Sequence, residues 1–413
     1  MYINTFLKIK PISDKSQSDY AFNTSLEGLR GICAIGVLLA HGFAKSWLDK
    51  NYSPPSLIPY FSFGSLAVYI FFMLSGYVIG LTVLKMQSFQ TPSFYKKRLI
   101  RLYPIYLLTF LSLLWLGTDT STWQTIGNML MLQNSRDYFG IHIPVISNLA
   151  PIWSLNYEIV YYLIFPIIFF LKPNFIVTIL ILLILSTLGY YSNFPTFIAN
   201  YSIGYIFWIT GLMLCWKLQE SKEIKYSVFS YIFLFISSHH LAYGDIIFKM
   251  LKLNSEKDHV LGLGILFYLP LCICALADFS GKTLPFKKLL LAISYALPAI
   301  IFCYLINSNR IFENDRWISC LIFYLLSILT YRFYSPHKFI INASAKIGAI
   351  SYALYITHLP LMLIIKKYFP YNGPYWYWLK FSIWASLTVL VSYALEKKLQ
   401  PKIVQFLREK NVI

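Results

Sequence analysis

The chain has 413 residues, of which 57% are hydrophobic and only 13% charged, and its 35 basic and 17 acidic residues give a formal net charge of +18. An average soluble protein carries roughly 25% charged residues, because a fold of this size exposes a large polar surface. The composition therefore excludes a disordered chain, a disulfide-rich secreted module and an ordinary cytosolic enzyme, and it indicates a protein that resides in lipid.

Twelve stretches of the chain are candidate membrane spans, since a helix crosses the hydrocarbon with about 20 mostly apolar residues. We therefore predict an all-α, polytopic transmembrane helix bundle of ten to twelve spans, with twelve counted. The predicted spans are 28–46, 64–84, 101–117, 151–171, 174–190, 200–217, 226–243, 260–277, 286–306, 316–333, 347–367 and 376–396. The membrane domain is expected at 26–398, between a short cytoplasmic tail at 1–25 without a signal-peptide pattern and a C-terminal tail at 399–413.

The distribution of basic residues favours a cytoplasmic position for both ends of the chain. With the first tail inside, 24 of the 35 lysines and arginines fall in inner segments. The same residues are spread over many short segments, so no compact basic domain presents them to nucleic acid. The six cysteines lie inside apolar runs, which predicts buried thiols and neither a disulfide framework nor a metal site.

The first predicted span carries Arg30 near its inner end and His41 near its outer end. Eleven residues make about three helical turns, so the two side chains lie near one face and about 16 Å apart along the axis. A single histidine at a helix end is more often an interfacial residue than a catalytic one. The shared face offers the alternative that both residues line one path through the bundle.

Small and basic residues mark the next two spans. Ser75 and Gly76 predict close packing of the second span against a neighbouring helix, or alternatively the wall of a narrow passage. Arg98 and Arg101 are three residues apart and share a helical face in the most basic stretch of the chain. They predict either a topological anchor or a cytoplasmic phosphate site, because Arg binds phosphate with bidentate geometry.

Glu158 is the one acid clearly inside a predicted span, where an ionisable side chain is costly and normally has a partner or a function. It is either a structural partner for a buried base or a carboxylate that takes part in acid–base chemistry. Its expected depth in the fourth span is close to that of His41. We therefore expect the two side chains to meet across neighbouring helices, where the carboxylate would fix the tautomer of the imidazole.

Three polar residues, Ser351, Tyr355 and His358, fall on one stripe of the eleventh predicted span. They predict an interhelical hydrogen-bond cluster or, alternatively, the polar wall of a substrate cavity. The stretch from 172 to 340 is supported by hydropathy alone and carries no comparable motif.

Five segments taken together resemble the membrane acyltransferase-3 family, the integral-membrane O-acyltransferases of bacterial cell-surface sugars. The matching segments are 26–31 with His41 at the Arg-x10-His spacing, 71–76 for F-F-x-L-S-G, 98–104 for R-x-x-R-L-Y-P, 153–158 for W-S-L-x-x-E and 351–358 for S-Y-x-L-Y-x-x-H. Each segment alone is a weak signal. All five in order are a strong one.

Three features depart from the family pattern. Glu27 stands where the family more often has Asp. Residues 396–398 (E-K-K) resemble a terminal E-R-P element, but Lys replaces Arg and the proline is displaced to Pro401. This difference argues against carrying over a role for Glu396. The family core has about ten spans, and we expect the surplus pair within 226–333.

The resemblance implies transfer of an acyl group, with acetyl preferred, from acetyl-CoA or another acyl-CoA at the cytoplasmic face to a hydroxyl of a surface glycan or lipid-linked saccharide. It also implies His41 as the essential catalytic residue and a location in the bacterial cytoplasmic membrane. His41 would act as general base, Glu158 would orient it, and Arg30 would stabilise developing charge. Direct transfer is preferred over a relay through acyl-histidine.

The remaining site residues are expected in two groups. The CoA phosphates would be held by Arg98, Arg101 and Tyr103. The substrate cavity would be lined by Ser75, Trp153, Ser351, Tyr355 and His358.

Two other function classes fit the composition. A lipid-linked-sugar flippase or an oligosaccharide exporter also needs many spans, although an internal repeat of six plus six helices, which would favour a carrier, is not evident. A glycan polymerase normally has a long extracytoplasmic loop, for which 118–150 is a modest candidate. The sequence predicts neither the acceptor sugar nor the oligomeric state.

Overall fold

The computed structural model describes residues 17–45, 47–55, 57–86, 88–117, 120–133, 141–146, 152–192, 194–221, 226–253, 261–333 and 337–410. These residues form helices and loops, with one isolated bridge between Glu220 and Lys282. The longer elements up to residue 250 are α2 Gln17–Gly42, α3 Gly64–Leu84, α4 Thr91–Trp115, α5 Thr122–Met129, α6 Trp153–Leu171, α7 Phe175–Tyr191, α8 Thr196–Lys217, α9 Val228–Leu241 and α10 Tyr243–Met250. The later ones are η3 Leu263–Tyr268, α11 Leu269–Phe279, α12 Lys287–Asn307, α13 Asp315–Leu329, α14 His337–Gly348, α15 Ser351–Tyr368, α16 Pro374–Tyr393, the π-helical turn η4 Ala394–Leu399 and α17 Gln400–Glu409.

The all-helical class is confirmed, and each of the twelve predicted ranges contains a helix. The count of twelve spans is not confirmed. Among the described residues, six helical stretches are long and apolar enough to cross a membrane, and α14 with α15 makes a seventh if that pair, bent by 64°, is one broken span. Some of the predicted spans contain helices shorter than the hydrocarbon; α9, for example, has 14 residues. At 1.5 Å per residue it extends about 21 Å, less than the hydrocarbon thickness of about 30 Å.

The structure also changes the expected tails and the long gap. The described part of the N-terminal region is helical from Gln17 onward, within the tail predicted at 1–25. The C-terminal tail predicted from residue 399 is helical through Glu409 as α17. The gap at 118–150 contains α5, while 134–140 and 147–150 lie outside the described residues.

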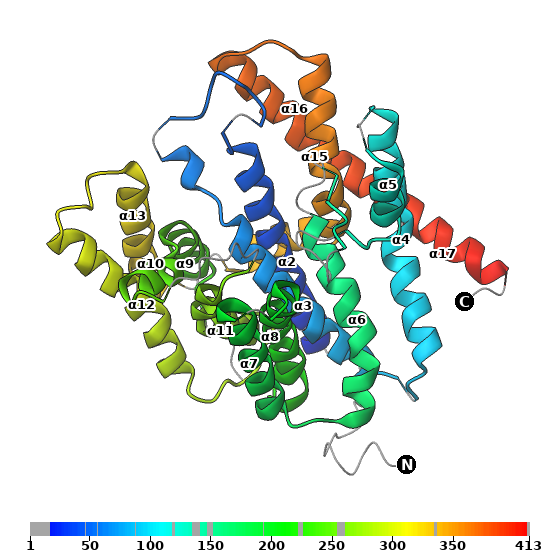
Figure 1. Cartoon of the computed structure of the whole chain (residues 1–413), viewed down its shortest axis with the longest axis horizontal. Helices are drawn as coiled ribbons and strands as arrows, with labels where there is room; N and C mark the ends of the chain where they lie inside the picture. The colour runs from blue at the N-terminus through cyan, green and yellow to red at the C-terminus, as the bar shows by residue number, and fades with distance from the viewer. Residues whose placement is uncertain are drawn as a thin grey trace.

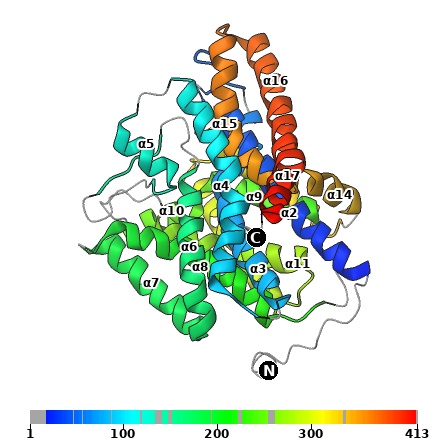
Figure 2. The same ribbon diagram turned by 90° about the vertical axis from the view of Figure 1, so that its right-hand side faces the viewer.

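Helices α3 and α8 form the centre of the molecule (Figures 1 and 2). Their apolar windows are 72% and 78% buried, against 33% for α4 at the edge. A Cβ added at Gly76 would lie 1.9 Å from the Trp208 carbonyl oxygen, and one at Gly211 would lie 1.9 Å from the Met73 carbonyl oxygen. Only glycine allows two helices to approach so closely. The predicted close packing at Gly76 is therefore confirmed.

A second close crossing joins α2 to α14. A Cβ at Gly31 would lie 1.8 Å from the Ser344 carbonyl oxygen, and one at Gly348 would lie 1.9 Å from the carbonyl oxygen of Glu27. This crossing fixes the start of α15, which follows α14 after a bend, against α2. It thereby positions the end of α2 against the middle of α15, where two histidines meet.

Candidate active site

His41 and His358 form a contact pair at one end of the bundle. The Nε2 atom of His358 lies 3.3 Å from Nδ1 of His41, and the ring centroids are 4.9 Å apart. His358 is buried, and the Trp384 indole donates a 2.6 Å hydrogen bond to its carbonyl oxygen. The Trp47 ring packs against the His41 ring, with 5.2 Å between the ring centroids.

The contacts of both rings favour one tautomer. Nδ1 of His41 lies 3.0 Å from the Val37 carbonyl oxygen, and Nδ1 of His358 lies 3.2 Å from the Leu354 carbonyl oxygen. A carbonyl only accepts, so each Nδ1 carries the hydrogen. His41 then shares its Nδ1–H between Val37 and Nε2 of His358. This arrangement leaves Nε2 of His41 as the basic nitrogen, the form that a general base requires.

Glu158 is held by hydroxyl groups rather than by His41. Ser75 donates a 2.8 Å hydrogen bond to Oε1 of Glu158, and the Tyr162 hydroxyl donates to the same oxygen. The Trp208 indole donates to Ser75 Oγ at 3.3 Å. The described contacts include none between Glu158 and His41, so the expected bond is not formed in this structure. A similar expected depth in two spans did not show which neighbouring helix the carboxylate faces.

The register of α6 against α15 explains this difference. Ser154, near the start of α6, bonds the Tyr355 hydroxyl at 2.7 Å, and Tyr355 is three residues before His358. Glu158 follows Ser154 by four residues, about 6 Å further from the histidine pair. Trp153 packs against the rings of Phe72 and Tyr157.

Arg98 is enclosed mainly by aromatic rings. Its guanidinium carbon lies 5.5 Å from the Phe94 ring centroid and 5.7 Å from that of Tyr162, distances typical of cation–π contacts. Its Nη2 lies 3.5 Å from Thr82 Oγ1, and its Nε is buried without a partner among the described residues. Tyr162 therefore connects Arg98 to the Glu158 carboxylate.

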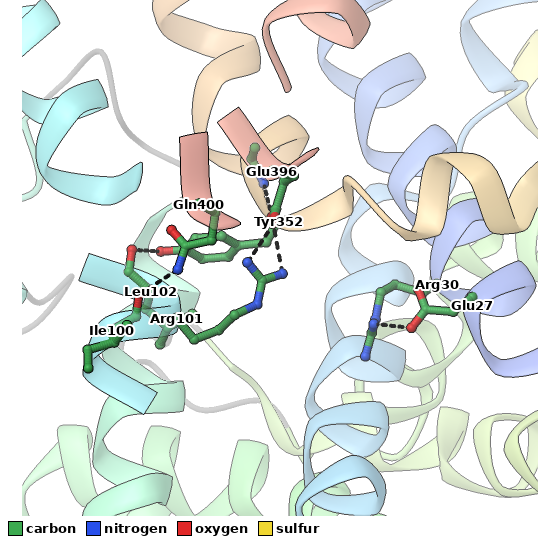
Figure 3. Close-up of polar contacts among 9 residues, drawn as sticks. Glu27, Arg30, Ile100, Arg101, Leu102, Tyr352, Glu396 and Gln400 are labelled. Atoms are coloured by element: carbon green, nitrogen blue, oxygen red, sulfur yellow. Dashed lines mark hydrogen bonds and ion pairs between the residues drawn. The ribbon is translucent and has the colours of Figure 1, made fainter. Parts of the chain in front are cut away.

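Arg101 forms a bidentate ion pair with Glu396, a residue to which sequence reasoning gave no role (Figure 3). The two hydrogen bonds to the carboxylate measure 2.6 and 3.1 Å. Glu396 is buried, and its Oε1 also accepts from the Ala353 N–H in the first turn of α15. The E-K-K element was the available sequence signal for this pair. The sequence did not show that Glu396 is buried in η4.

Neighbouring contacts hold the Arg101 pair between α4, α15 and the C-terminal helices (Figure 3). The guanidinium carbon of Arg101 lies 5.4 Å from the Tyr352 ring centroid, and the Tyr352 hydroxyl donates to the Leu102 carbonyl at 2.7 Å. Gln400 donates to the Ile100 carbonyl at 2.6 Å. The Arg101 side chain is 43% exposed, so it remains accessible to a ligand.

The remaining predicted residues are more peripheral. Arg30 forms a 2.6 Å ion pair with Glu27 on α2, in a group separate from Arg101 (Figure 3). Tyr103 is half-buried, with its ring 6.5 Å from that of Tyr106. Ser351 is buried at the first residue of α15.

Three of the site residues thus lie along the first half of α15. We call Tyr352, Tyr355 and His358 the α15 column; their partners are Arg101, Ser154 and His41 in that order. The arrangement can hold an anion at the arginine end and accept a proton at the histidine end. No group of three or more His, Cys, Asp or Glu side chains suited to a metal ion occurs in the part of the chain that the structure describes.

Comparisons with known proteins agree on one family. The model of a family described as "Acyltransferase domain" matches residues 23–397. "Acyltransferase MdmB" of Streptomyces mycarofaciens is 30% identical over 155 residues, which cover 35% of this chain and 38% of that protein. "Putative O-acetyltransferase SACOL0978" of Staphylococcus aureus strain COL is 24% identical over 376 residues, or 83% of this chain and 51% of that protein. The chain thus spans about half the length, or less, of these curated relatives. No solved structure matches.

Proposed function

This chain belongs to the acyltransferase family whose domain covers residues 23–397, and we propose that it moves an acetyl group from acetyl-CoA to a hydroxyl of a surface or lipid-linked saccharide. Membership makes it a membrane O-acyltransferase. The donor, the acceptor and the role of each side chain are our inference. We place the protein in the bacterial cytoplasmic membrane, with its twelve apolar segments inside the bilayer and both ends on the cytoplasmic side.

The observation that best supports this proposal is the orientation of His41. Val37 and His358 hold its Nδ1–H, so Nε2 is available to take the proton from an acceptor hydroxyl. The hydroxyl oxygen then attacks the thioester carbonyl carbon, the C–S bond breaks, and CoA leaves as the thiol after receiving the proton from His41. Direct transfer of this kind needs no covalent acyl-histidine.

The arginine end supports the assignment of the donor. Arg101 uses only part of its five-donor guanidinium on Glu396, so N–H groups remain for a phosphate. A cavity of about 290 Å³ at the start of α4 is lined by Lys97 and by polar residues beside Arg98. Tyr103 and Arg30 would complete the contacts to a bound anion, and Glu396 would hold Arg101 in position.

The acyl arm of the donor is proposed to reach the histidine end along the α15 column, while the acceptor reaches His41 from the outer side. Tyr355, Ser154 and the Glu158–Ser75 group supply hydroxyl groups along this path. Because Glu158 bonds Ser75 and Tyr162, its proposed role is to keep these hydroxyls oriented rather than to orient His41 directly.

The test is consumption of the thioester by the full-length protein in nanodiscs. Free thiol released from acetyl-CoA is followed with and without a saccharide acceptor, and the melting temperature is measured with CoA. We expect acceptor-dependent thiol release and stabilisation by CoA. A flippase or exporter would neither cleave acetyl-CoA nor gain stability from CoA, and that result would reject acyl transfer by this chain.

A further inference from the structure

A second cavity, of about 430 Å³, lies at the histidine end of the bundle and is unusually basic. Four lysines from three separate segments line it: Lys50, Lys366, Lys367 and Lys380. We call it the lysine cavity. No acidic residue is among its lining residues in the described chain. Lys366 lies close enough to Lys50 and Lys380 to experience their repulsion. A cluster of like charges around one hollow is electrostatically costly unless an anion enters it.

Asp49 holds the buried lysine of the cluster, Lys380, in position. Oδ1 of Asp49 accepts the backbone N–H groups of Asn51 and Tyr52 at 2.9 and 3.0 Å, and Oδ2 accepts that of Gly373 at 2.9 Å. Lys380 is buried, with Nζ 3.4 Å from Asp49 Oδ2 and 2.8 Å from the Tyr371 carbonyl oxygen. Asp49 therefore pairs with Lys380, and its carboxylate is already shared among four donors.

Part of the lining of the lysine cavity is apolar. It is formed by Leu113 and Leu116 from the end of α4 together with Leu363 and Phe369. Trp115, beside them, is 79% exposed, as expected of an aromatic residue at the boundary between lipid and water. A ligand for this cavity combines a compact anion with an apolar chain.

The lysine cavity is also near the histidine pair. Lys366 follows His358 by eight residues on α15, about 12 Å along the axis. Lys380 precedes Trp384 by one turn of α16, and the Trp384 indole bonds the His358 carbonyl. A molecule anchored by its anion in the cavity can therefore present a hydroxyl at His41.

We propose that the lysine cavity binds the phosphate or diphosphate group of a lipid-linked saccharide and that this molecule is the acyl acceptor. Lysine binds phosphate as a point charge, and a diphosphate neutralises more of this cluster than a single carboxylate does. The apolar wall takes the first part of the lipid chain. The role as acceptor rests on the proposed function, whereas the phosphate site itself does not.

The experiment measures equilibrium binding of radiolabelled farnesyl diphosphate, a diphosphate on a short apolar chain, to the full-length protein in nanodiscs. The test variant is Lys50→Gln/Lys367→Gln, because both side chains are exposed and Lys380 is left intact. The control is Lys402→Gln/Lys410→Gln, which removes the same charge from exposed positions of the C-terminal region. One arm uses phosphatidylcholine nanodiscs, and the other adds phosphatidylglycerol.

We expect binding about tenfold or more weaker in the test variant and unchanged in the control, in both lipid arms, since charge-assisted hydrogen bonds each contribute this order of affinity. Equal binding by all three proteins would reject the site. Loss of binding in the phosphatidylglycerol arm alone would assign the cavity to bulk phospholipid and overturn the acceptor role. Thiol release from acetyl-CoA is scored separately, so a failure of acyl transfer is distinguishable from a failure of this site.

Discussion

At one end of the α15 column two imidazole rings meet and are fixed by backbone carbonyls, whereas at the other end a guanidinium shares a carboxylate and stays partly exposed. The first arrangement fixes which nitrogen carries a hydrogen. The second presents charge to the surroundings while holding its position. From this difference we propose a division of work, in which His41 acts in the chemical step and Arg101 in binding the donor.

The largest expected effect is that of His41→Gln. Loss of a general base lowers kcat by about 10²- to 10⁴-fold. The KM for acetyl-CoA should change little, because the arginine end is untouched. Steady-state kinetics of purified protein check this expectation.

The matched control for this variant is His142→Gln, which changes an exposed histidine outside the helices. It should retain normal turnover. If the His41→Gln protein were abundant and inserted in the membrane and its turnover stayed close to normal, His41 would have no role in the chemical step.

The next effect concerns the pair at the arginine end. Arg101→Gln should raise the KM for acetyl-CoA about tenfold and lower the melting temperature, because Glu396 is left as a buried carboxylate without its partner. Arg101→Gln/Glu396→Gln should recover the melting temperature but not the KM. Arg332→Gln, at an exposed arginine, is the control. If the double variant restored the KM as well, the pair would be structural only.

A smaller effect is expected for His358, which acts through His41 as a positioning residue. His358→Phe removes the acceptor for the His41 Nδ1–H, and kcat should fall about tenfold, the value of one hydrogen bond. His358→Gln supplies an amide oxygen and should recover most of this loss. Equal kcat values for the Phe and Gln variants would show that the ring only fills space.

The smallest expected effect is a change in melting temperature when Asp49, in the loop between α2 and α3, is substituted. Burial alone would raise the pKa of Asp49, but the N–H groups of Asn51 and Gly373 and the charge of Lys380 hold it below its ordinary value of 3.8. Because the pKa of Asp49 is lower in the folded state than in the unfolded state, its ionised form stabilises the fold. This contribution is complete at pH values above the unfolded-state pKa, and it is lost as the pH falls through the folded-state pKa. Asp49→Asn should therefore lower the melting temperature equally at pH 7 and pH 5.5. Below about pH 3.8 the difference from the unchanged protein should shrink, and a constant difference there would contradict this assignment.

Several features were predictable from local sequence. The range predicted for the second span, 64–84, coincides with α3, and the close packing at Gly76 follows from a small residue in an apolar helix. The Arg-x10-His spacing and the late S-Y-x-L-Y-x-x-H element pointed to His41 and His358. Hydropathy and helix-packing glycines depend on neighbours in the chain, which is why the bounds and the close packing of α3 could be predicted.

The features that were missed depend on contacts across the chain. Glu396 is 295 residues from Arg101, and its burial depends on how η4 packs against α4 and α15. The pairing of Glu158 with Ser75 depends on how α6 packs against α3, which the expected depth of each residue in its span does not show. The count of twelve spans is not confirmed, and hydropathy does not show where α9 stops, at Ala242 in a left-handed conformation.

The division between the two ends is tested most directly by acyl transfer from saturating acetyl-CoA in Arg101→Gln and His41→Gln, measured side by side. We predict that Arg101→Gln regains most of the normal rate at saturation, because its defect lies in binding, while His41→Gln stays at or below about 1%. Equal residual rates in the two variants at saturation, or recovery by His41→Gln, would contradict the account.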